Sequence, residues 1–241
     1  MNNDFLPINE DQDHTGADNN QMFMVPLVDH GIFEQAKKMA GTVVEYRELR
    51  MMYSCAIKEI KTKLQVLNDE LSIKRQRNPI EFIKTRVKQP DSIASKLRRK
   101  GYPVTVQSVF ENLSDVAGVR VICAFIDDIY KVADMLTAQD DIELIKRKDY
   151  IKNPKMNGYR SLHLIIEVPV FFSDHKEQIR VEVQIRTIAM DFWASLEHQL
   201  KYKKDIDDAE SIMYELRACA DVINRTDYHM QSLRDRIVEN L

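Results

Sequence analysis

The stretch Ile179-Arg180-Val181-Glu182-Val183-Gln184-Ile185-Arg186-Thr187 alternates apolar and polar residues with a period of two. This period indicates a β-strand with one buried face, because successive side chains of a strand point to opposite sides. The polar face keeps a carboxylate, an amide and two guanidinium groups, as the floor of a polar site does. A solvent-exposed face that pairs with itself is an equally good interpretation of this stretch taken alone.

Four other stretches predict strands of the same sheet. Residues 162–168 precede the first strand and join it through a turn at 173–177, so we expect the two strands to be antiparallel neighbours. Residues 115–125 are a continuous apolar run that begins with a carboxylate, which indicates a buried strand. Residues 79–88 and 142–145 complete the set.

Helical spacing of apolar residues predicts the remaining elements. Residues 32–71 form one long helix, or two helices that break near Gly41, and residues 206–240 form a last helix. Asp91 and Asp127 are expected to cap two shorter helices, the first of which stops at Gly101. A further helix begins at Thr187. The expected fold is α+β: a mixed, mainly antiparallel β-sheet flanked by helices, with long N- and C-terminal helices.

The composition sets the domain organisation. The 241 residues carry a formal net charge of −3 and 44% hydrophobic residues, which suits one domain with helical extensions. We expect a disordered tail at 1–21, an N-terminal helical segment at 22–78, a catalytic domain at 79–204 and a C-terminal helix for oligomerisation at 205–241. The short apolar run at 22–27 packs on the body or on a neighbouring subunit.

Charge and cysteines limit the functional classes. A slightly acidic chain is not a general nucleic-acid binder, so its basic clusters are local features. The three cysteines have no metal-binding or disulfide spacing, which favours a reducing, cytoplasmic compartment. No apolar run is long enough to cross a membrane, and the N-terminus has acidic residues where a signal peptide has lysines.

The loop Lys148-Asp149-Tyr150-Ile151-Lys152-Asn153-Pro154-Lys155-Met156-Asn157-Gly158-Tyr159-Arg160-Ser161-Leu162-His163 combines cations, an amide, aromatic rings and an imidazole. Pro154 fixes φ and Gly158 permits positive φ, so the two bracket a rigid loop. Cations around a ring that can stack suit a purine nucleotide with a polyphosphate tail. An ordinary solvated basic loop explains the composition equally well.

A second cationic group precedes the apolar strand. Arg86 and Lys88 lie on one side of an extended segment, while Ser92 and Lys96 share a helix face near its positive end. Such a cluster can hold phosphate groups, although a solvated basic helix remains an alternative. Arg120 lies within the apolar run and needs a partner or a ligand, because burying a bare arginine is costly.

These motifs together resemble the synthetase domain of the RelA/SpoT family. The resemblance rests on Asp149-Tyr150-Ile151, Pro154-Lys155, Asn157-Gly158-Tyr159-Arg160-Ser161-Leu162-His163 and Glu182-Val183-Gln184-Ile185-Arg186-Thr187, and covers residues 80–203. The short chain is similar to the small alarmone synthetases. The resemblance implies a nucleotidyltransferase-like domain that is a GTP diphosphokinase. Such an enzyme transfers the β,γ-pyrophosphate of ATP to the 3′-hydroxyl of GTP or GDP, giving AMP and pppGpp or ppGpp for the stringent response.

The resemblance also assigns roles to residues. Asp115 and Glu182 match the catalytic acids that hold Mg²⁺, and Glu182 also activates the 3′-hydroxyl. The ATP-binding positions, of which the two arginines enclose adenine, are Arg86, Lys88, Ser92, Lys96 and Arg120. Tyr159 matches the ring that stacks on guanine. The other positions matching the GTP/GDP site are Lys148, Lys155, Asn157, His163 and Gln184.

The resemblance has limits as well. No His-Asp pair of the family's hydrolase domain is present, so no hydrolase activity is expected. Small members form homotetramers, and in some an alarmone binds a central cleft as an allosteric activator, at positions that fall in the divergent N-terminal half here. Residues 102–112 depart from the shortest members. Two alternatives stay open: a toxic relative that pyrophosphorylates the tRNA 3′ end, with RNA binding left undecided, and a non-catalytic nucleotide-binding module. The sequence does not decide between GTP and GDP.

Overall fold

The computed structural model describes residues 30–75, 77–201 and 209–238. The chain divides into two units, Met1–Gly41 and Thr42–Leu241. The expected tail at 1–21 and the apolar run at 22–27 lie outside the described residues. Helix α1 (His30–Arg75) is a single helix with no break at Gly41.

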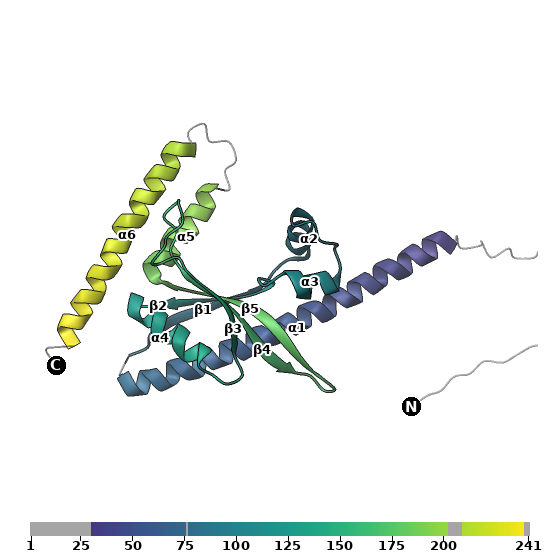
Figure 1. The fold of residues 1–241 in the computed structure, drawn as a ribbon, viewed down its shortest axis with the longest axis horizontal. Helices are drawn as coiled ribbons and strands as arrows, with labels where there is room; N and C mark the ends of the chain where they lie inside the picture. Colours follow the sequence, from purple (N-terminus) through teal and green to yellow (C-terminus); the bar gives the residue numbers. More distant parts are fainter. Residues whose placement is uncertain (1–29, 76, 202–208, 239–241) are drawn as a thin grey trace, which may run out of the picture. The chain divides into compact units, whose positions relative to one another are not determined.

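A five-stranded sheet forms the centre of the second unit (Figure 1). Its strands, in spatial order, are β1 (Ile80–Val87), β2 (Ala117–Cys123), β5 (Lys176–Thr187), β4 (Leu162–Phe171) and β3 (Glu143–Asp149). Only β2 and β5 run parallel; the other three neighbouring pairs are antiparallel. The expected mixed, mainly antiparallel sheet is therefore confirmed, as is the antiparallel pairing of β4 with β5.

One face of the sheet is the apolar core. Ile179, Val181, Val183 and Ile185 of β5 are fully buried, as the alternation predicts. Their direct partners on β4 and β2 are also apolar and buried. Buried residues of α1 and of α4 (Ile126–Thr137) join the same hydrophobic cluster. Because this face is covered, the opposite face of the sheet is left for polar side chains.

The shorter helices begin one or two residues before the expected caps. Helix α2 (Pro90–Arg99) has Gln89 at its N-cap and Pro90 in its first turn, where the missing N–H of proline does no harm. Phe125 has the N-cap position of α4. Asp91 and Asp127 therefore lie in the first turns, where a carboxylate favours the positive helix end, and the prediction that they are caps is wrong. Gly101, at φ 79°, follows the end of α2 as expected.

The structure has one helix that the sequence did not predict and one strand that is longer than predicted. Residues 102–112 contain a short helix, α3 (Val106–Asn112), whose N-cap Thr105 accepts a hydrogen bond from the amide of Ser108. Strand β3 continues to Asp149, so Lys148 lies on a strand and not in the loop.

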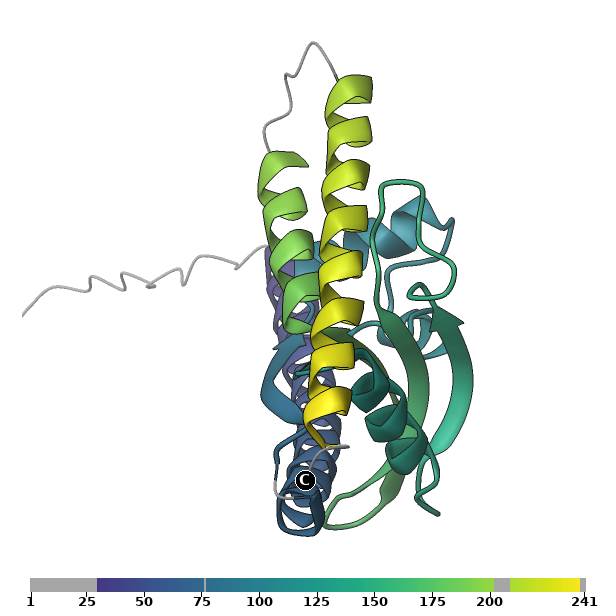
Figure 2. The ribbon, with the colours of Figure 1, turned by 90° about the vertical axis from the view of Figure 1, so that its left-hand side faces the viewer.

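The last two helices lie side by side in both views (Figures 1 and 2). Helix α5 (Ile188–Lys201) follows β5 directly, and α6 (Ala209–Val238) is the long C-terminal helix. Trp193 of α5 donates from Nε1 to the carbonyl oxygen of Leu216 on α6, at 2.9 Å. Thr187, at the end of β5, donates to Asp227 of α6 at 2.6 Å and accepts from the amide of Met190. Thr187 therefore joins the sheet, α5 and α6.

The contact at Asp227 makes stability depend on pH. Burial raises the pKa of the Asp227 carboxyl, and the hydrogen bond from Thr187 only partly offsets this. Since the folded-state pKa is above the unfolded value, ionisation of Asp227 opposes folding at neutral pH, and this penalty disappears as the pH falls through the folded pKa. Asp227→Asn keeps an oxygen that can accept from Thr187 but removes the charge.

We therefore expect Asp227→Asn to melt above the wild type at about pH 7, with the difference shrinking towards about pH 4. Thermal melts across this range provide the measurement, and Asp140→Asn, at an exposed carboxyl, is the control. A lower melting temperature for Asp227→Asn at neutral pH would contradict the assignment of Asp227 as a penalised buried charge.

Candidate active site

The register of the sheet arranges the polar face into two rows that cross all the strands. In the order β1-β2-β5-β4-β3, directly paired residues give the first row as Lys84, Arg120, Gln184, His163 and Lys148. The second row is Arg86, Gly118, Glu182, Ile165 and Lys146. Residues separated by up to 100 positions in the chain therefore share one surface, and Glu182 lies in its middle strand.

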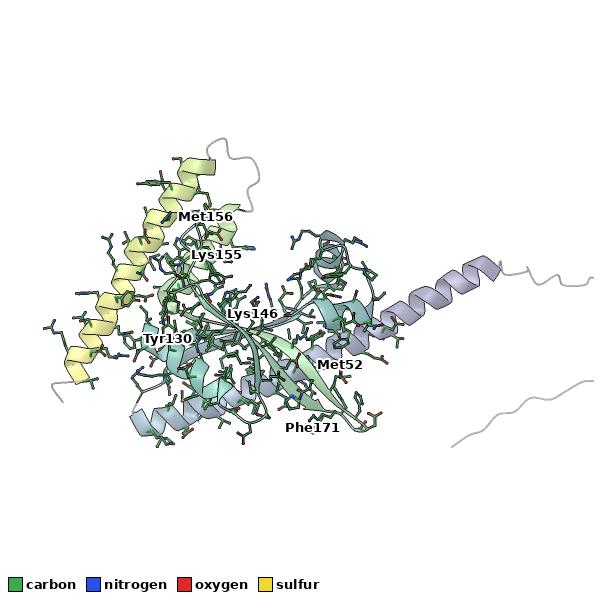
Figure 3. All side chains as sticks on the ribbon, in the orientation of Figure 1. Met52, Tyr130, Lys146, Lys155, Met156 and Phe171 are labelled. Atoms are coloured by element: carbon green, nitrogen blue, oxygen red, sulfur yellow. The ribbon has the colours of Figure 1, made fainter. Side chains whose placement is uncertain are left out.

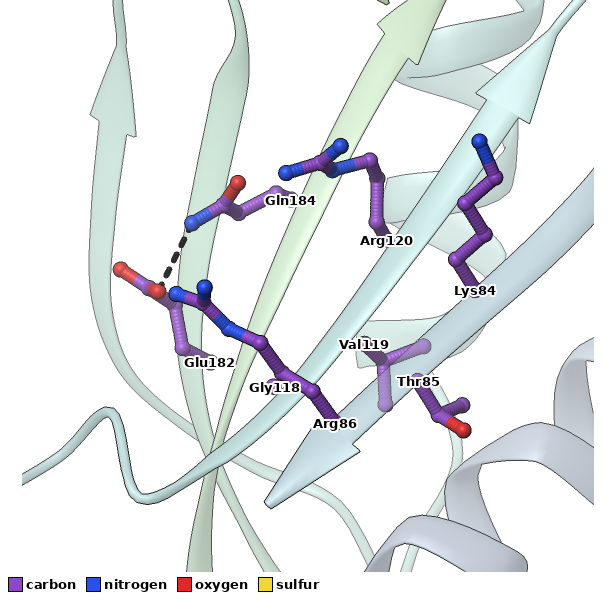
Figure 4. Close-up of a pocket in the computed structure, with 8 residues that line it drawn as sticks. All are labelled: Lys84, Thr85, Arg86, Gly118, Val119, Arg120, Glu182 and Gln184. Carbon is purple, nitrogen blue, oxygen red and sulfur yellow. Dashed lines mark hydrogen bonds between the residues drawn. The ribbon is translucent and has the colours of Figure 1, made fainter. Parts of the chain in front are cut away.

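A pocket of about 200 Å³ lies on the β1–β2–β5 side of this surface (Figure 4). Arg86, Arg120, Gln184 and Glu182 line it, together with Lys84 and Gly118. Gly118 is the direct partner of Arg86 across the strands, and a Cβ there would lie 3.4 Å from Cγ of Arg86. The glycine therefore leaves room for the Arg86 side chain to extend over β2 towards Glu182. Two guanidinium groups over a shallow pocket can hold a flat, electron-rich ring.

A second pocket of about 290 Å³ lies on the β5–β4–β3 side of the same surface. Its wall is strongly cationic, with ammonium groups from α2 and from β3. The lining residues are Lys96, Lys100, Ser114, Asp115, Lys146, Lys148, His163, Ile165 and Glu182. Glu182 lines both pockets. The two spaces therefore meet at one carboxylate, and the second has the charge that phosphate groups require.

Asp115 connects Lys88, which directly follows β1, and Lys96 of α2 to this junction. Its Oδ2 atom is 2.8 Å from Nζ of Lys88 and 2.6 Å from Nζ of Lys96. Burial alone would raise the pKa of the Asp115 carboxyl, but the two ammonium groups outweigh burial and hold the pKa below its ordinary value. Its other oxygen, Oδ1, is buried and has no hydrogen-bond partner among the described residues. A buried, ionised oxygen that lacks a donor suits a cation, because an unsatisfied carboxylate is costly.

Glu182 is held in its ionised form by neighbours on the same face. Gln184 donates from Nε2 to Oε2 at 2.8 Å, and Nδ1 of His163 lies 3.4 Å from Oε1. Burial pushes the pKa of the Glu182 carboxyl upwards, yet His163 and Gln184 together keep it below its ordinary value. Glu182 is thus a carboxylate at neutral pH, available to accept a proton or to share a cation with Asp115.

The loop that follows β3 places an aromatic ring beside His163. The hydroxyl of Tyr159 lies 2.8 Å from Nε2 of His163 and accepts from Nη2 of Arg186 at 2.5 Å. Nζ of Lys155 lies 4.6 Å from the centre of the Tyr159 ring. The side-chain oxygen of Asn157 accepts from the amide of Tyr159, which shapes the backbone at this point. Figure 3 shows Lys155 in this loop and Lys146 nearer the middle of the sheet.

Comparisons with known proteins show the family of the chain. Residues 85–207 match the family described as a region found in RelA / SpoT proteins. The chain belongs to the RelA/SpoT family. Its curated relatives include the GTP pyrophosphokinases YwaC and YjbM of Bacillus subtilis (strain 168), at 43% identity over 197 residues and 35% over 195. Each alignment covers 81% of this chain, and 94% and 91% of the relatives.

Solved structures of small alarmone synthetases have the same fold. Small alarmone synthetase 1 of Bacillus subtilis, bound to its product pppGpp, superposes with a TM-score of 0.72 at 35% identity, covering 80% of this chain and 98% of the other. Small alarmone synthetase 2 of the same organism gives 0.71 at 43%, covering 79% and 98%. The family resemblance read from the sequence is confirmed.

Most of the residues that the family resemblance singles out are brought together, but not all are in the pocket walls. Arg86, Arg120, Gln184, Lys96, Asp115, Lys148, His163 and Glu182 line one pocket or both. Lys88 reaches the site through Asp115. Ser92, Lys155, Asn157 and Tyr159, all within the described part of the chain, line neither. Ser92 is exposed on the first turn of α2, and Asn157 donates to Glu197 of α5 at 3.0 Å.

The structure adds a buried ion network that the sequence interpretation did not assign to the site. Asp191 of α5 lies 3.1 Å from Arg120 and 3.2 Å from Arg186. Arg186, only 4% exposed, also donates to Gln184 and to Tyr159. This network supplies the partner that Arg120 required, and it links the arginine of the first pocket to the ring of the loop. The alternation in β5 places Arg186 on the polar face, but nothing in the sequence pairs it with Asp191.

Two cations of the second pocket, Lys100 and Lys146, were also missed. Lys146 is two residues before Lys148 on β3 and therefore shares its face. The period-two rule could have found Lys146 if the strand had been extended to Asp149. Lys100 is the C-cap of α2 and has no such signal.

Proposed function

We propose that the protein is a GTP pyrophosphokinase that transfers the β,γ-pyrophosphate of ATP to the 3′-hydroxyl of GTP or GDP. The observation that carries the proposal is the position of Glu182, which lines both the arginine pocket and the cationic pocket. Two nucleotides that react with each other need such a shared point between two binding spaces. The identity to GTP pyrophosphokinases over 81% of the chain supports the same conclusion.

The ATP side of the reaction is assigned to β1, β2 and α2. Arg86 and Arg120 enclose adenine, with Lys88 and Lys96 beside Asp115 to bind the phosphates. Ser92, on the first turn of α2, adds a hydroxyl near the helix N-terminus. These groups fix the triphosphate and neutralise its charge, which is most of what phosphoryl-type transfer demands of a protein.

The guanine side is assigned to β3, β4 and the loop between them. Tyr159 stacks on guanine, while Lys148, Lys155, Asn157, His163 and Gln184 bind the rest of the nucleotide. Glu182 accepts the proton of the 3′-hydroxyl, whose oxygen then attacks the β-phosphorus of ATP. The bond from that phosphorus to the α–β bridging oxygen breaks, and AMP leaves with the electron pair. The His163 and Gln184 contacts keep Glu182 ionised for this step.

Mg²⁺ is the proposed cofactor, with Asp115 and Glu182 as its protein ligands. The unpartnered oxygen of Asp115 fits this role. Within the described residues no group of three or more His, Cys, Asp or Glu side chains is arranged to hold a metal ion, but Mg²⁺ is commonly held by one or two carboxylates plus substrate phosphates. When bound, the ion would supply charge neutralisation at the transferred phosphates.

The choice of acceptor tests this proposal against its alternatives. Purified protein is incubated with ATP and Mg²⁺, and with GTP, GDP, tRNA or no acceptor. We expect AMP to form only with the guanine nucleotides, together with pppGpp or ppGpp. Transfer to tRNA alone would favour the toxic-relative alternative, and nucleotide binding without AMP formation would favour a non-catalytic module. Added pppGpp tests whether an alarmone is also an allosteric effector. Incubation with pppGpp alone tests the expected lack of hydrolase activity.

Tyr159→Ala is expected to impair guanine-nucleotide use selectively. Stacking of a base on an aromatic ring is worth roughly 1–3 kcal/mol, so the KM for GTP should rise about tenfold or more. Tyr159→Phe is the matched control, since it keeps the ring and loses only the hydroxyl contacts to His163 and Arg186. Steady-state kinetics with each substrate varied in turn measures the effect. A lower melting temperature with an unchanged KM for GTP would show that Tyr159 is merely structural.

We also propose a homotetramer assembled through the terminal helices. Large apolar side chains are exposed on α1 and α6, and extended apolar patches on a soluble monomer are rare. On α1 these are Val44, Met51, Val66 and Ile73, and on α6 they are Tyr214, Val222, Tyr228, Met230, Ile237 and Val238. Light scattering is expected to give four times the chain mass of 28.2 kDa. A particle of one chain mass would contradict the assembly.

The domain limits and the compartment complete the proposal. Residues 79–204 are the catalytic domain, with helical segments at 22–78 and 205–241 for assembly. None of the described helices is long and apolar enough to span a membrane. The cysteines Cys55, Cys123 and Cys219 are free thiols, which supports a cytoplasmic location.

A further inference from the structure

Helix α6 is fixed to the rest of the unit at several points along its length. Near its C-terminal end, Oε1 of Gln231 accepts from the amide of Asp127 at 3.0 Å, and Arg234 donates to the Asp127 carboxylate at 2.6 Å. The Arg234 guanidinium also lies 4.6 Å from the centre of the Phe125 ring. With the contacts of Asp227 and Leu216 described above, these anchors run along most of the helix. Helix α6 therefore has a defined position on the body of the unit.

The same helix touches the loop that carries Tyr159. Gly158 has φ 89°, and a Cβ at this position would lie 2.5 Å from Cβ of Ala220 and 3.3 Å from Cα of Arg217. The loop backbone is therefore in direct contact with the α6 backbone, and it can approach this closely because both residues are small. Ala220 is buried by this contact, at 4% exposure.

An arginine of the loop makes the contact polar as well as steric. Arg160 donates from Nη1 to the carbonyl oxygen of Gly158 and from Nη2 to Oδ1 of Asp221, each at 3.1 Å. Its side chain is only 13% exposed. One guanidinium group thus holds the backbone of its own loop and a carboxylate of α6 at the same time, which fixes the distance between them.

The loop is also joined to the sheet: Tyr159 accepts from Arg186 of β5 at 2.5 Å, Ser161 donates to the carbonyl oxygen of Ile185, and Ile151 lies in the hydrophobic core. The internal hydrogen bonds of the loop are local, such as Gly158 to Lys155 at 2.8 Å and Lys155 to Tyr159 at 3.2 Å. Asn157 reaches α5 through Glu197. Tyr159 lies between Gly158 and Arg160, the two residues that α6 holds. A shift of α6 at this point would therefore displace the backbone on both sides of the Tyr159 ring.

We propose that α6 is a strap that positions the guanine-nucleotide loop, with Ala220 and Asp221 as its positioning residues. This inference rests on the proposed function for the identity of the loop's ligand. It assigns α6 a role in guanine affinity in addition to its role in assembly. Neither residue touches substrate; both act through Gly158 and Arg160 on Tyr159.

The test uses the full chain with Ala220→Leu and Asp221→Asn. Ala220→Leu forces the loop away from the helix, and Asp221→Asn removes the charge that holds Arg160 while leaving the size unchanged. Ala218→Leu is the matched control, because Ala218 is on the same helix but exposed. Hydrogen exchange of residues 150–161 in the protein without nucleotide reports on the loop itself. Steady-state kinetics with GTP or GDP and with ATP reports on the consequence.

Both variants are expected to speed exchange in the loop, with the amides of β4 and β5 unchanged. The value of kcat/KM for the guanine nucleotide should fall by about ten- to a hundredfold, while the KM for ATP stays within about twofold, because displacing a binding group by about 1 Å has effects of this size. Ala218→Leu should match the wild type. If Ala220→Leu does not fold, the exchange and kinetic measurements on Asp221→Asn alone test the proposal.

Two results would overturn the strap. One is unchanged loop exchange in both folded variants; the other is an equal loss for ATP and for the guanine nucleotide. If the wild type transfers nothing to any guanine nucleotide, the proposed function fails. In that case the exchange measurement still decides whether α6 holds the loop.

Discussion

Glu182→Gln is expected to abolish transfer while the protein stays folded. The substitution keeps the size of the side chain and an oxygen that can accept from Gln184, but it removes the negative charge at the junction of the two pockets. The variant therefore loses both the base that accepts the 3′-hydroxyl proton and a proposed ligand of the metal ion. The rate should fall by at least ~10²-fold. Turnover under saturating ATP and GTP is the measurement, with thermal melting as the check on folding.

Glu167→Gln is the matched control for this result. Glu167 is on the same face of β4 as His163, but it pairs with Arg180 at 2.7 Å and lines neither pocket. Glu167→Gln should therefore leave turnover close to that of the wild type. A folded Glu182→Gln variant with near wild-type turnover would remove Glu182 from the mechanism.

Asp115→Asn is the second substitution with a large expected effect. It removes the charge that holds Lys88 and Lys96, and it replaces one of the two carboxylate oxygens by an NH2 group, so one side chain can no longer face both the lysines and Mg²⁺ with oxygen. Loss of a metal ligand in such a site costs several kcal/mol of transition-state stabilisation, so turnover should fall by about a hundredfold or more. The Mg²⁺ concentration for half-maximal rate should rise as well, which a purely structural role would not produce.

Asp115→Asn should also change how the stability of the protein depends on pH. Because the pKa of Asp115 is lowered in the fold, its ion pairs stabilise the protein above the unfolded pKa, and this contribution is lost as the pH falls through the folded pKa. Asp115→Asn should therefore melt below the wild type at neutral pH, with the difference disappearing in acid. Asp140→Asn, at an exposed carboxyl, is the control. An unchanged Mg²⁺ requirement in Asp115→Asn would contradict the metal assignment.

The parts of the fold that could be predicted are those in which one local rule dominates. Period-two alternation predicts the buried face of β5, because Val181 and Val183 have nowhere else to be buried. The helix caps were harder to predict than the strands. Asp91 and Asp127 are typical cap residues, yet Gln89 and Phe125 hold the cap positions, because the extended backbone before each helix already ends at these two residues. Helix α3 was missed because it is short and follows Pro103.

The site shows a similar division. Alternation along β5 places Glu182, Gln184 and Arg186 on one face, but it cannot give the register between strands that are far apart in sequence. The pairing of Arg120 with Gln184, and of Gly118 with Glu182, comes from the parallel β2–β5 contact and is invisible in either strand alone. Asp191 was missed for the same reason, since its role depends on two arginines from different strands. The family resemblance named eight of the residues that line the two pockets, and the register explains why most of them lie together.

The most direct test of the central claim follows the phosphates of ATP. The protein is incubated with GTP, Mg²⁺ and ATP labelled at the γ-phosphate, and the products are separated and quantified. AMP and a labelled guanosine product are expected to form in equal amounts, with the label in a diphosphate on the 3′-oxygen. Formation of ADP or labelled orthophosphate in place of AMP would contradict transfer of pyrophosphate between the two pockets that Glu182 joins.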